Sequence, residues 1–184
     1  MERCTWATTK LMKKYHDEEW GKPLHDDQSL FELLILETMQ AGLSWATILA
    51  KRENYRKALD GFNPAKIVLY NQEKLEELNS NPGIIRNKLK NASIIKNAKA
   101  FFKVKQEYET FDRYIWSFVD GQPIINHFNS MESLPAKTEL SLKMSKDMKK
   151  RGFSFVGPVT CYAFMEAAGL VNDHINVCSF KYRI

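Results

Sequence analysis

The sequence predicts an all-α protein. Helical signals recur along its 184 residues, strand signals are almost absent, and no Gly-, Pro- or Ser-rich linker divides the chain. The length is that of about one domain. We therefore expect a single domain over residues 1–184, built of about eight helices that are joined by short polar turns.

The first helices are predicted in the N-terminal third of the chain. Residues 25–42 read HDDQSLFELLILETMQAG, with Asp and Ser residues that suit an N-terminal cap and a glycine, Gly42, that suits the end. A second helix is expected to begin after Ser44 as its N-cap. Asn63 followed by Pro64 is the start signal of a further helix.

The later helices are predicted in the same way. Residues 86–108 repeat apolar side chains at the spacing of one face of a long amphipathic helix. Shorter helical segments are expected over residues 110–121 and 138–152. The last helix begins with Pro158 in its first turn and ends before Gly169, which suits the C′ position.

Composition narrows the class of protein. Hydrophobic residues make up 44% and charged residues 27%, which is typical of a soluble globular protein. No apolar run approaches the roughly 18 residues of a membrane span, and the N-terminus lacks an apolar signal core. We therefore expect a cytoplasmic protein without a membrane partner. The net charge of +5 suits a nucleic-acid-binding protein, but equally a soluble protein that is merely basic.

Four candidate metal ligands lie near the ends of the chain. At i, i+4, His174 and Cys178 would share one face of a helical turn, and Cys4 and His16 could complete a tetrahedral zinc site. Such a site would tie together termini that otherwise fray. The alternative is unrelated thiols and packed histidines, because this spacing is not that of a zinc finger. The remaining cysteine, Cys161, lies in an apolar helix and is expected to be buried.

Two glycine turns are candidates for contact with a DNA backbone. Gly157 directly precedes a helix whose first N–H groups are free for a phosphate, and the helix before it is rich in lysine. Gly83, followed by Arg86, Lys88 and Lys90, is a second candidate. The commoner alternative is an ordinary turn between helices with solvated lysines.

A carboxylate lies inside the apolar helix of residues 25–42. A carboxylate at Glu37 costs free energy there unless it is paired or its site uses the charge. Gln40 lies on the same face of the predicted helix. Leu43 is expected at a loop tip, while Trp45 and Tyr15 offer aromatic rings. Glu37, Gln40, Tyr15 and Trp45 together suit a planar, hydrogen-bonding ligand such as a purine base, either cationic or neutral. The alternatives are a rim residue or an internal salt bridge for Glu37, and a core aromatic for Trp45.

These separate signals together resemble one family. The stretches that carry the resemblance run in order from Met1 to about Cys178, and they include "MERCTW", "YHDEEWG", "LETMQAGLSW", "GIIRNKLK" and "FVGPVTCYAFMEAAGLVNDH". They are similar to 3-methyladenine DNA glycosylase I, a family of constitutive bacterial base-excision enzymes. One position departs from the family pattern: members often carry an aromatic residue where this chain has Met12.

The resemblance implies a helix–hairpin–helix DNA glycosylase fold, with two helical subdomains around a cleft and the hairpin at about residues 150–169. Within it, Gly157 would contact the DNA backbone. The terminal segments 1–20 and 170–184 would pack together around one structural zinc ion. The resemblance assigns four ligands to that ion: Cys4, His16, His174 and Cys178.

The resemblance also implies roles for the pocket residues. Glu37 would contact the methylated adenine and be required for activity, with Tyr15 and Trp45 beside the base and Gln40 as a weaker candidate. Leu43 would fill the gap that the flipped base leaves in the duplex. Asp173 is expected to be structural, and the chain offers no convincing lysine nucleophile, which implies no lyase activity.

The implied function is repair of alkylated double-stranded DNA. A monomer would flip out 3-methyladenine, hydrolyse its N-glycosidic bond and release the free base. We expect Glu37 to be held ionised in a partly dry pocket, where it favours a cationic purine. The alternatives are a helix–hairpin–helix DNA-binding module without catalysis, or a glycosylase relative with another substrate. A zinc hydrolase is disfavoured, because no water-activating group lies near the ligands in sequence.

Overall fold

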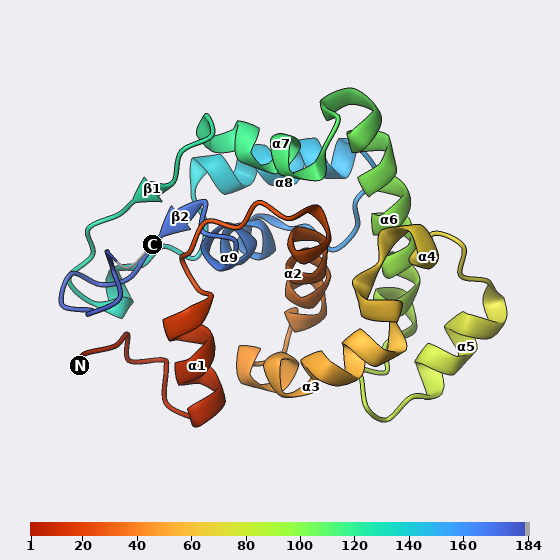
Figure 1. Cartoon of the computed structure of the whole chain (residues 1–184), viewed down its shortest axis with the longest axis horizontal. Helices are drawn as coiled ribbons and strands as arrows, with labels where there is room; N and C mark the ends of the chain where they lie inside the picture. The colour runs from red at the N-terminus through yellow and green to blue at the C-terminus, as the bar shows by residue number, and fades with distance from the viewer. Residues whose placement is uncertain (183–184) are drawn as a thin grey trace.

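The computed structural model describes residues 1–182, and nearly all of its regular secondary structure is helical (Figure 1). This part of the chain contains nine α-helices: α1 (Lys10–Glu18), α2 (Asp27–Gln40), α3 (Trp45–Ala58), α4 (Pro64–Ile67), α5 (Gln72–Ser80), α6 (Lys88–Tyr108), α7 (Phe111–Trp116), α8 (Glu139–Lys150) and α9 (Pro158–Ala167). Three single 3₁₀ turns lie between them: η1 (Asp60–Phe62), η2 (Ser117–Val119) and η3 (Met131–Ser133). The expectation of a mostly helical protein is confirmed.

A short parallel strand pair was not predicted. Strand β1 (Ile124–Ile125) pairs with β2 (Val171–Asn172), and the Ile124 N–H donates to the carbonyl of Leu170 at 2.9 Å. Two residues are too few to show the alternating pattern of a strand in the sequence. Only the folded chain brings these two extended segments together.

The helix starts follow the capping signals in the sequence. The Asp26 side chain accepts a hydrogen bond from a first-turn N–H of α2, Ser44 does the same for α3, and Asn63 does so for α4. Each of these side chains satisfies a backbone donor that the helix itself leaves free. Helix α9 differs, because its N-cap is Gly157 and no side chain caps it.

Helix α2 is the centre of the fold. All ten side chains from Leu30 to Met39 are buried, as expected for a helix that other elements surround (Figure 1). Two of them are carboxylates. Glu32 is paired with Arg52 and Arg56 of α3, and the Arg56 Nη2–Glu32 Oε1 distance is 2.8 Å. Glu37 has no such ion pair among the described residues and faces a cavity instead.

The end of α9 is fixed against the segment that follows α1. Gly169 has φ +72°, and a Cβ atom there would lie 2.2 Å from the carbonyl carbon of Lys22. Backbone hydrogen bonds join the same segments, from Gly21 to Glu166 and from Leu24 to Ala168. The predicted C′ glycine is therefore also a point of close backbone approach, which holds α9 in place beside the N-terminal segment.

Within residues 1–182, the segment before α1 and the segment after β2 lie side by side (Figure 1). The Ser179 N–H donates to the Glu2 carbonyl at 3.0 Å, and the Glu2 N–H donates to Ser179 Oγ at 3.1 Å. Side chains from both ends join α1 and α3 in a second buried cluster, separate from the main core: Cys4, Met12, Tyr15, Trp20, Leu49, Ile175, Cys178 and Phe180.

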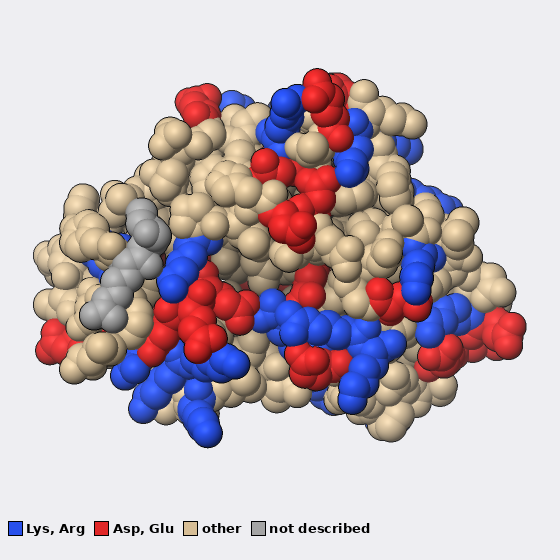
Figure 2. All heavy atoms as spheres, in the orientation of Figure 1, with Lys and Arg blue, Asp and Glu red and all other residues tan. Residues whose placement is uncertain are grey.

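Acidic and basic side chains are interspersed on the face that Figure 2 shows. The positive net charge is thus not gathered into one patch on this side of the molecule. Among the described residues, no helix has the length and apolarity that crossing a membrane requires.

Candidate functional site

A cavity of about 230 Å³ opens between α1, α2, α3 and α9. Glu37 and Gln40 reach it from one face of α2, while Tyr15 comes from α1 and Trp45 from the first residue of α3. The structure therefore brings together the four side chains that the sequence predicts for a base pocket. The full lining is Trp6, Met12, Tyr15, Trp20, Glu37, Gln40, Trp45, Met131, Ala163 and Glu166.

Leu43, predicted at a loop tip, lines an adjoining hollow of about 190 Å³. This hollow shares Glu37, Gln40 and Ala163 with the cavity. It extends to the turn that carries Leu43 and to Val159 and Thr160 at the start of α9. The exposed Leu43 and the uncapped N-terminus of α9 thus flank one opening beside the cavity.

The Glu37 carboxyl group is a buried part of the cavity lining. Its side chain is 4% exposed, and its Oε2 atom has no hydrogen-bond partner in the described chain. Burial raises the pKa of Glu37 to about 8. The neutral form is therefore favoured at pH 7, which corrects the expectation of an ionised carboxylate in the free protein. The rim-residue and salt-bridge alternatives are wrong, because the group is buried and unpaired.

Aromatic rings form the walls of the cavity. The Tyr15 and Trp45 rings are 5.2 Å apart, with an angle of 54° between their planes. The Trp45 Nε1–H is buried without an acceptor in the described chain. Burial, and then the Glu37 charge, raises the pKa of Tyr15 well above its usual range, so its phenol stays neutral.

Leu43 is carried by a tight turn between α2 and α3. The Leu43 N–H donates to the Gln40 carbonyl at 2.6 Å. Ala41 has φ −46° and ψ 114°, and Gly42 has φ +80°, which is the geometry of a type II turn. That turn requires a positive φ at its third position, where glycine is the residue without strain. The helix end predicted near Gly42 is confirmed, because α2 ends at Gln40.

In the second glycine turn proposed for phosphate binding, the glycine N–H group already has a hydrogen-bond partner inside the protein. The Gly83 N–H donates to Asn81 Oδ1 at 2.8 Å. Lys90, expected to be solvated or to face DNA, is buried, and its ammonium group donates to the carbonyls of Met39 and Ala41. The proximity of lysines in sequence did not show that one of them turns inward to cap the end of α2.

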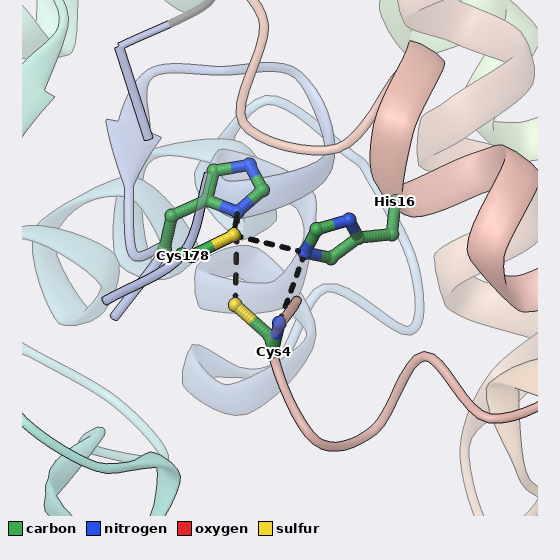
Figure 3. Close-up of side chains that lie close together, drawn as sticks. Cys4, His16 and Cys178 are labelled. Atoms are coloured by element: carbon green, nitrogen blue, oxygen red, sulfur yellow. Dashed lines mark hydrogen bonds between the residues drawn. The ribbon is translucent and has the colours of Figure 1, made fainter. Parts of the chain in front are cut away.

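The four candidate metal ligands converge at the joined termini (Figure 3). Their ligand atoms all lie within 4.8 Å of one another, and all four side chains are buried. Cys178 Sγ lies 3.3 Å from His174 Nδ1 and 3.5 Å from His16 Nε2, while Cys4 Sγ lies 3.6 Å from His174 Nδ1. A tetrahedral zinc site places sulfur and nitrogen ligands about 3.6 Å apart, so the spacing fits this ion.

The surroundings of the cluster orient both imidazoles towards its centre. His16 Nδ1 lies 2.8 Å from Asp17 Oδ1, and His174 Nε2 lies 3.1 Å from the Trp20 carbonyl. The other nitrogen of each ring faces the cysteines, as in metal sites whose histidines are held by outer hydrogen bonds. Burial lowers the pKa of His174 to about 4 and also lowers that of His16, which favours the neutral, metal-binding form.

The local structure of the second ligand pair differs from the prediction. His174 and Cys178 were expected on a helical turn, but they lie in a non-helical segment after β2. The Cys178 N–H donates to the Ile175 carbonyl at 2.9 Å, which closes a β-turn. The turn brings the two side chains to the same point as one turn of helix would.

Residues 6–182 match the methyladenine glycosylase family. The chain belongs to this family. DNA-3-methyladenine glycosylase of Haemophilus influenzae is 48% identical over 180 residues, which are 97% of each chain. DNA-3-methyladenine glycosylase 1 of Escherichia coli is 46% identical over 179 residues, 97% of this chain and 96% of that one. A 3-methyladenine DNA glycosylase I variant, solved in complex with 3-methyladenine, superposes with a TM-score of 0.95 at 36% identity, covering 98% of both chains.

Five lining residues of this glycosylase-family cavity were missed in the sequence: Trp6, Trp20, Met131, Ala163 and Glu166. Trp6 and Trp20 are both close to α1, and their rings meet edge to face at 5.1 Å. They lie outside the regular apolar pattern of a helix, so periodicity gave no signal. Glu166, by contrast, lies in the apolar helix α9, and the reasoning applied to Glu37 would have found it. Burial, Asp173 and Glu37 raise the pKa of Glu166 well above its usual range.

Asp173 and Cys161, two other residues of the family motif, have hydrogen-bond partners inside the protein. Asp173 is fully buried and accepts hydrogen bonds from Tyr162 Oη at 2.5 Å and Asn126 Nδ2 at 2.7 Å. It does not line the cavity described above. Cys161 is fully buried, as expected, and its Sγ lies 3.6 Å from the carbonyl of Val156.

Proposed function

We propose that this member of the methyladenine glycosylase family removes 3-methyladenine from alkylated double-stranded DNA. It would act as a monomer that hydrolyses the N-glycosidic bond and has no lyase activity. The observation that carries the proposal is the buried Glu37 carboxyl group, with one oxygen unpaired, in an aromatic cavity of base size. The 3-methyladenine that a 36% identical relative holds in its solved complex supports this substrate.

The proposed architecture is that of a helix–hairpin–helix glycosylase. Helix α8, the turn of residues 151–157 and α9 form the hairpin, and the site lies in a cleft between two helical subdomains of one domain, residues 1–184. Gly157 would contact a DNA phosphate, because α9 has no side-chain cap and a Cβ atom at Gly157 would meet nothing within 4 Å. This anion site lies beside the opening that Val159 and Leu43 flank.

The first step of the proposed mechanism is base flipping. A target atom inside a duplex is out of reach, so the damaged nucleotide has to leave the stack, at a cost of a few kcal/mol. Leu43, exposed at the tip of its turn, would fill the vacated space. The base then enters the cavity, where Tyr15 and Trp45 contact its faces and the free Trp45 Nε1–H meets an acceptor.

The second step uses the charge of the substrate. Methylation at N3 makes the adenine cationic and a good leaving group. A nearby cation favours the ionised form of a carboxyl group, so Glu37 releases its proton to solvent water as the base enters. The carboxylate then stabilises positive charge that spreads to the sugar as the C1′–N9 bond breaks. The bonding electrons go to N9, water adds to C1′ and loses a proton, and free 3-methyladenine is released.

We propose that Cys4, His16, His174 and Cys178 hold one zinc ion. When bound, this ion supplies a cross-link between the two ends of the chain. Four protein ligands leave no open coordination position for a water molecule, so the proposed role is structural. The same cross-link would hold α1, and with it Tyr15, in place against the cavity.

Base release from methylated duplex DNA tests the proposed function. Wild-type protein is expected to free 3-methyladenine, and Glu37→Gln is expected to bind DNA but free none. Glu73→Gln, on the exposed surface of α5, is the matched control and should act like wild type. If the wild-type protein binds DNA and frees no base, the chain is a DNA-binding module. Release of another base instead indicates an altered substrate.

A further inference from the structure

Helix α6 places a buried lysine beneath the turn that carries Leu43. The Lys90 side chain is 6% exposed. Its Nζ atom donates to the carbonyl of Met39 at 2.8 Å and to that of Ala41 at 2.6 Å. In residues 1–182, no carboxylate pairs with this ammonium group, and burial lowers its pKa. Burying a cation without a carboxylate partner costs free energy. The reason for placing Lys90 here therefore lies in what its hydrogen bonds hold.

The two carbonyls belong to the end of α2 and to the turn itself. Met39 lies in the last turn of α2, and Ala41 is the second residue of the type II turn. Between them, the Gln40 carbonyl accepts the Leu43 N–H. Three consecutive carbonyls are thus engaged, two of them by one cation, which also complements the negative end of the α2 dipole.

Side-chain packing does not hold this turn. Ala41, Gly42, Leu43 and Ser44 are all exposed. Beyond the hydrogen bonds described, Ser44 Oγ accepts the Thr47 N–H and so fixes the start of α3. The position of Leu43 therefore depends on backbone hydrogen bonds, and Lys90 is the only side chain from outside residues 39–47 that supplies them within the described chain.

We propose that Lys90 is a positioning residue for base flipping, which holds the turn of residues 40–43 rigid so that Leu43 can enter the duplex. The proposal rests on the gap-filling role assigned to Leu43 under the proposed function. A loose turn would have to be ordered at the moment of insertion, and that loss of conformational freedom would oppose flipping. A turn already fixed by α6 avoids this cost.

Comparison of double-stranded with single-stranded substrate isolates this role, because a single strand has no stack for Leu43 to fill. We expect Lys90→Met to lower single-turnover release of 3-methyladenine from methylated duplex at least about tenfold. Release from a methylated single strand is expected to fall less than about twofold. Lys99→Met is the matched control, because Lys99 is exposed on the same helix, and it should leave both rates unchanged.

A double-mutant cycle completes the test. Leu43→Ala should show the same selective loss on duplex DNA, and adding it to Lys90→Met should cause little further loss, because both changes remove one function. Equal losses on both substrates, additive losses or unchanged duplex release would overturn the proposal. If Lys90→Met does not fold, Lys90→Gln, whose amide can still donate one hydrogen bond, takes its place. Failure of the proposed function is distinct: wild-type protein would then release no base from either substrate.

Discussion

Cys178 Sγ lies 3.5 Å from Nε2 of His16, although 162 positions separate the two residues in the chain. This contact joins the segment after β2 to helix α1, which also carries Tyr15 of the candidate base pocket. The metal cluster and the pocket thus share one helix. Loss of the cluster is therefore expected to disturb the position of Tyr15 as well as the fold.

Metal content is the first prediction. Protein purified without chelator is expected to contain about one zinc ion per chain, and Cys178→Ser is expected to lose it. Because metal binding contributes directly to folding, we expect the free energy of unfolding to fall by more than about 3 kcal/mol. Metal analysis and denaturant unfolding measure the two quantities. Cys161→Ser, which removes a buried thiol outside the cluster, should keep the zinc. Folded, active wild-type protein without metal would contradict the prediction.

The stability of the protein should depend on the ionisation of Glu37. Its pKa is raised from 4.5 to about 8 in the folded state, so the folded protein holds a proton that the unfolded chain has released. The stability from this group is complete below pH 4.5 and declines as the pH rises to about 8. Glu37→Gln removes this decline and should stabilise the free protein at pH 8, by on the order of 1–3 kcal/mol.

Unfolding by denaturant at pH 5 and pH 8 measures this effect. The difference between Glu37→Gln and wild type, rather than either stability alone, reports on Glu37, because other groups titrate in the same range. A difference that does not change between the two pH values would show that Glu37 keeps an ordinary pKa.

Base release should depend on pH through the same group. If ionised Glu37 is the active form, kcat/KM on methylated duplex rises about tenfold per unit while the pH is well below 8, and it levels off above that value. Binding of undamaged duplex, measured over the same range at constant ionic strength, corrects for changes in DNA affinity. A flat kcat/KM between pH 6 and pH 9 would argue against ionised Glu37 as the active form.

Alanine substitutions at two glycines can distinguish the cost of backbone strain from an effect on the Leu43 turn. Gly42 has φ +80° and Gly121 has φ +74°, and a Cβ atom at either would meet nothing within 4 Å. Alanine at each should therefore cost about 1 kcal/mol of unfolding free energy through backbone strain alone. Only Gly42→Ala should also lower base release from duplex DNA. Equal activities in the two variants would mean that the exact shape of the turn is unimportant.

Much of the fold and of the site could be predicted from local signals. The caps Asp26, Ser44 and Asn63 act within a single turn of helix, so the sequence alone places the helix starts. Glu37 and Gln40 share a face because an α-helix has a fixed period, and both reach the cavity. The family motifs then relate these residues to a base pocket. Residue spacing by itself left the zinc site open.

The local environments could not be predicted in the same way. Nothing in the sequence distinguished Lys90, which turns inward to cap α2, from its solvated neighbours, and nothing showed that Glu37 would be neutral in the free protein. Both outcomes depend on what packs around a side chain, and that is set by segments distant in the chain.

The sequence by itself therefore determined the helical class, the helix starts, the family and four side chains of the candidate pocket, because these follow from local backbone chemistry and from family motifs. Only the tertiary structure decided the strand pair, the convergence of the four metal ligands, the inward position of Lys90 and the raised pKa of Glu37. The physical reason is that burial and long-range contact change the free energy of a charge or a hydrogen bond, and neither is encoded in residue spacing.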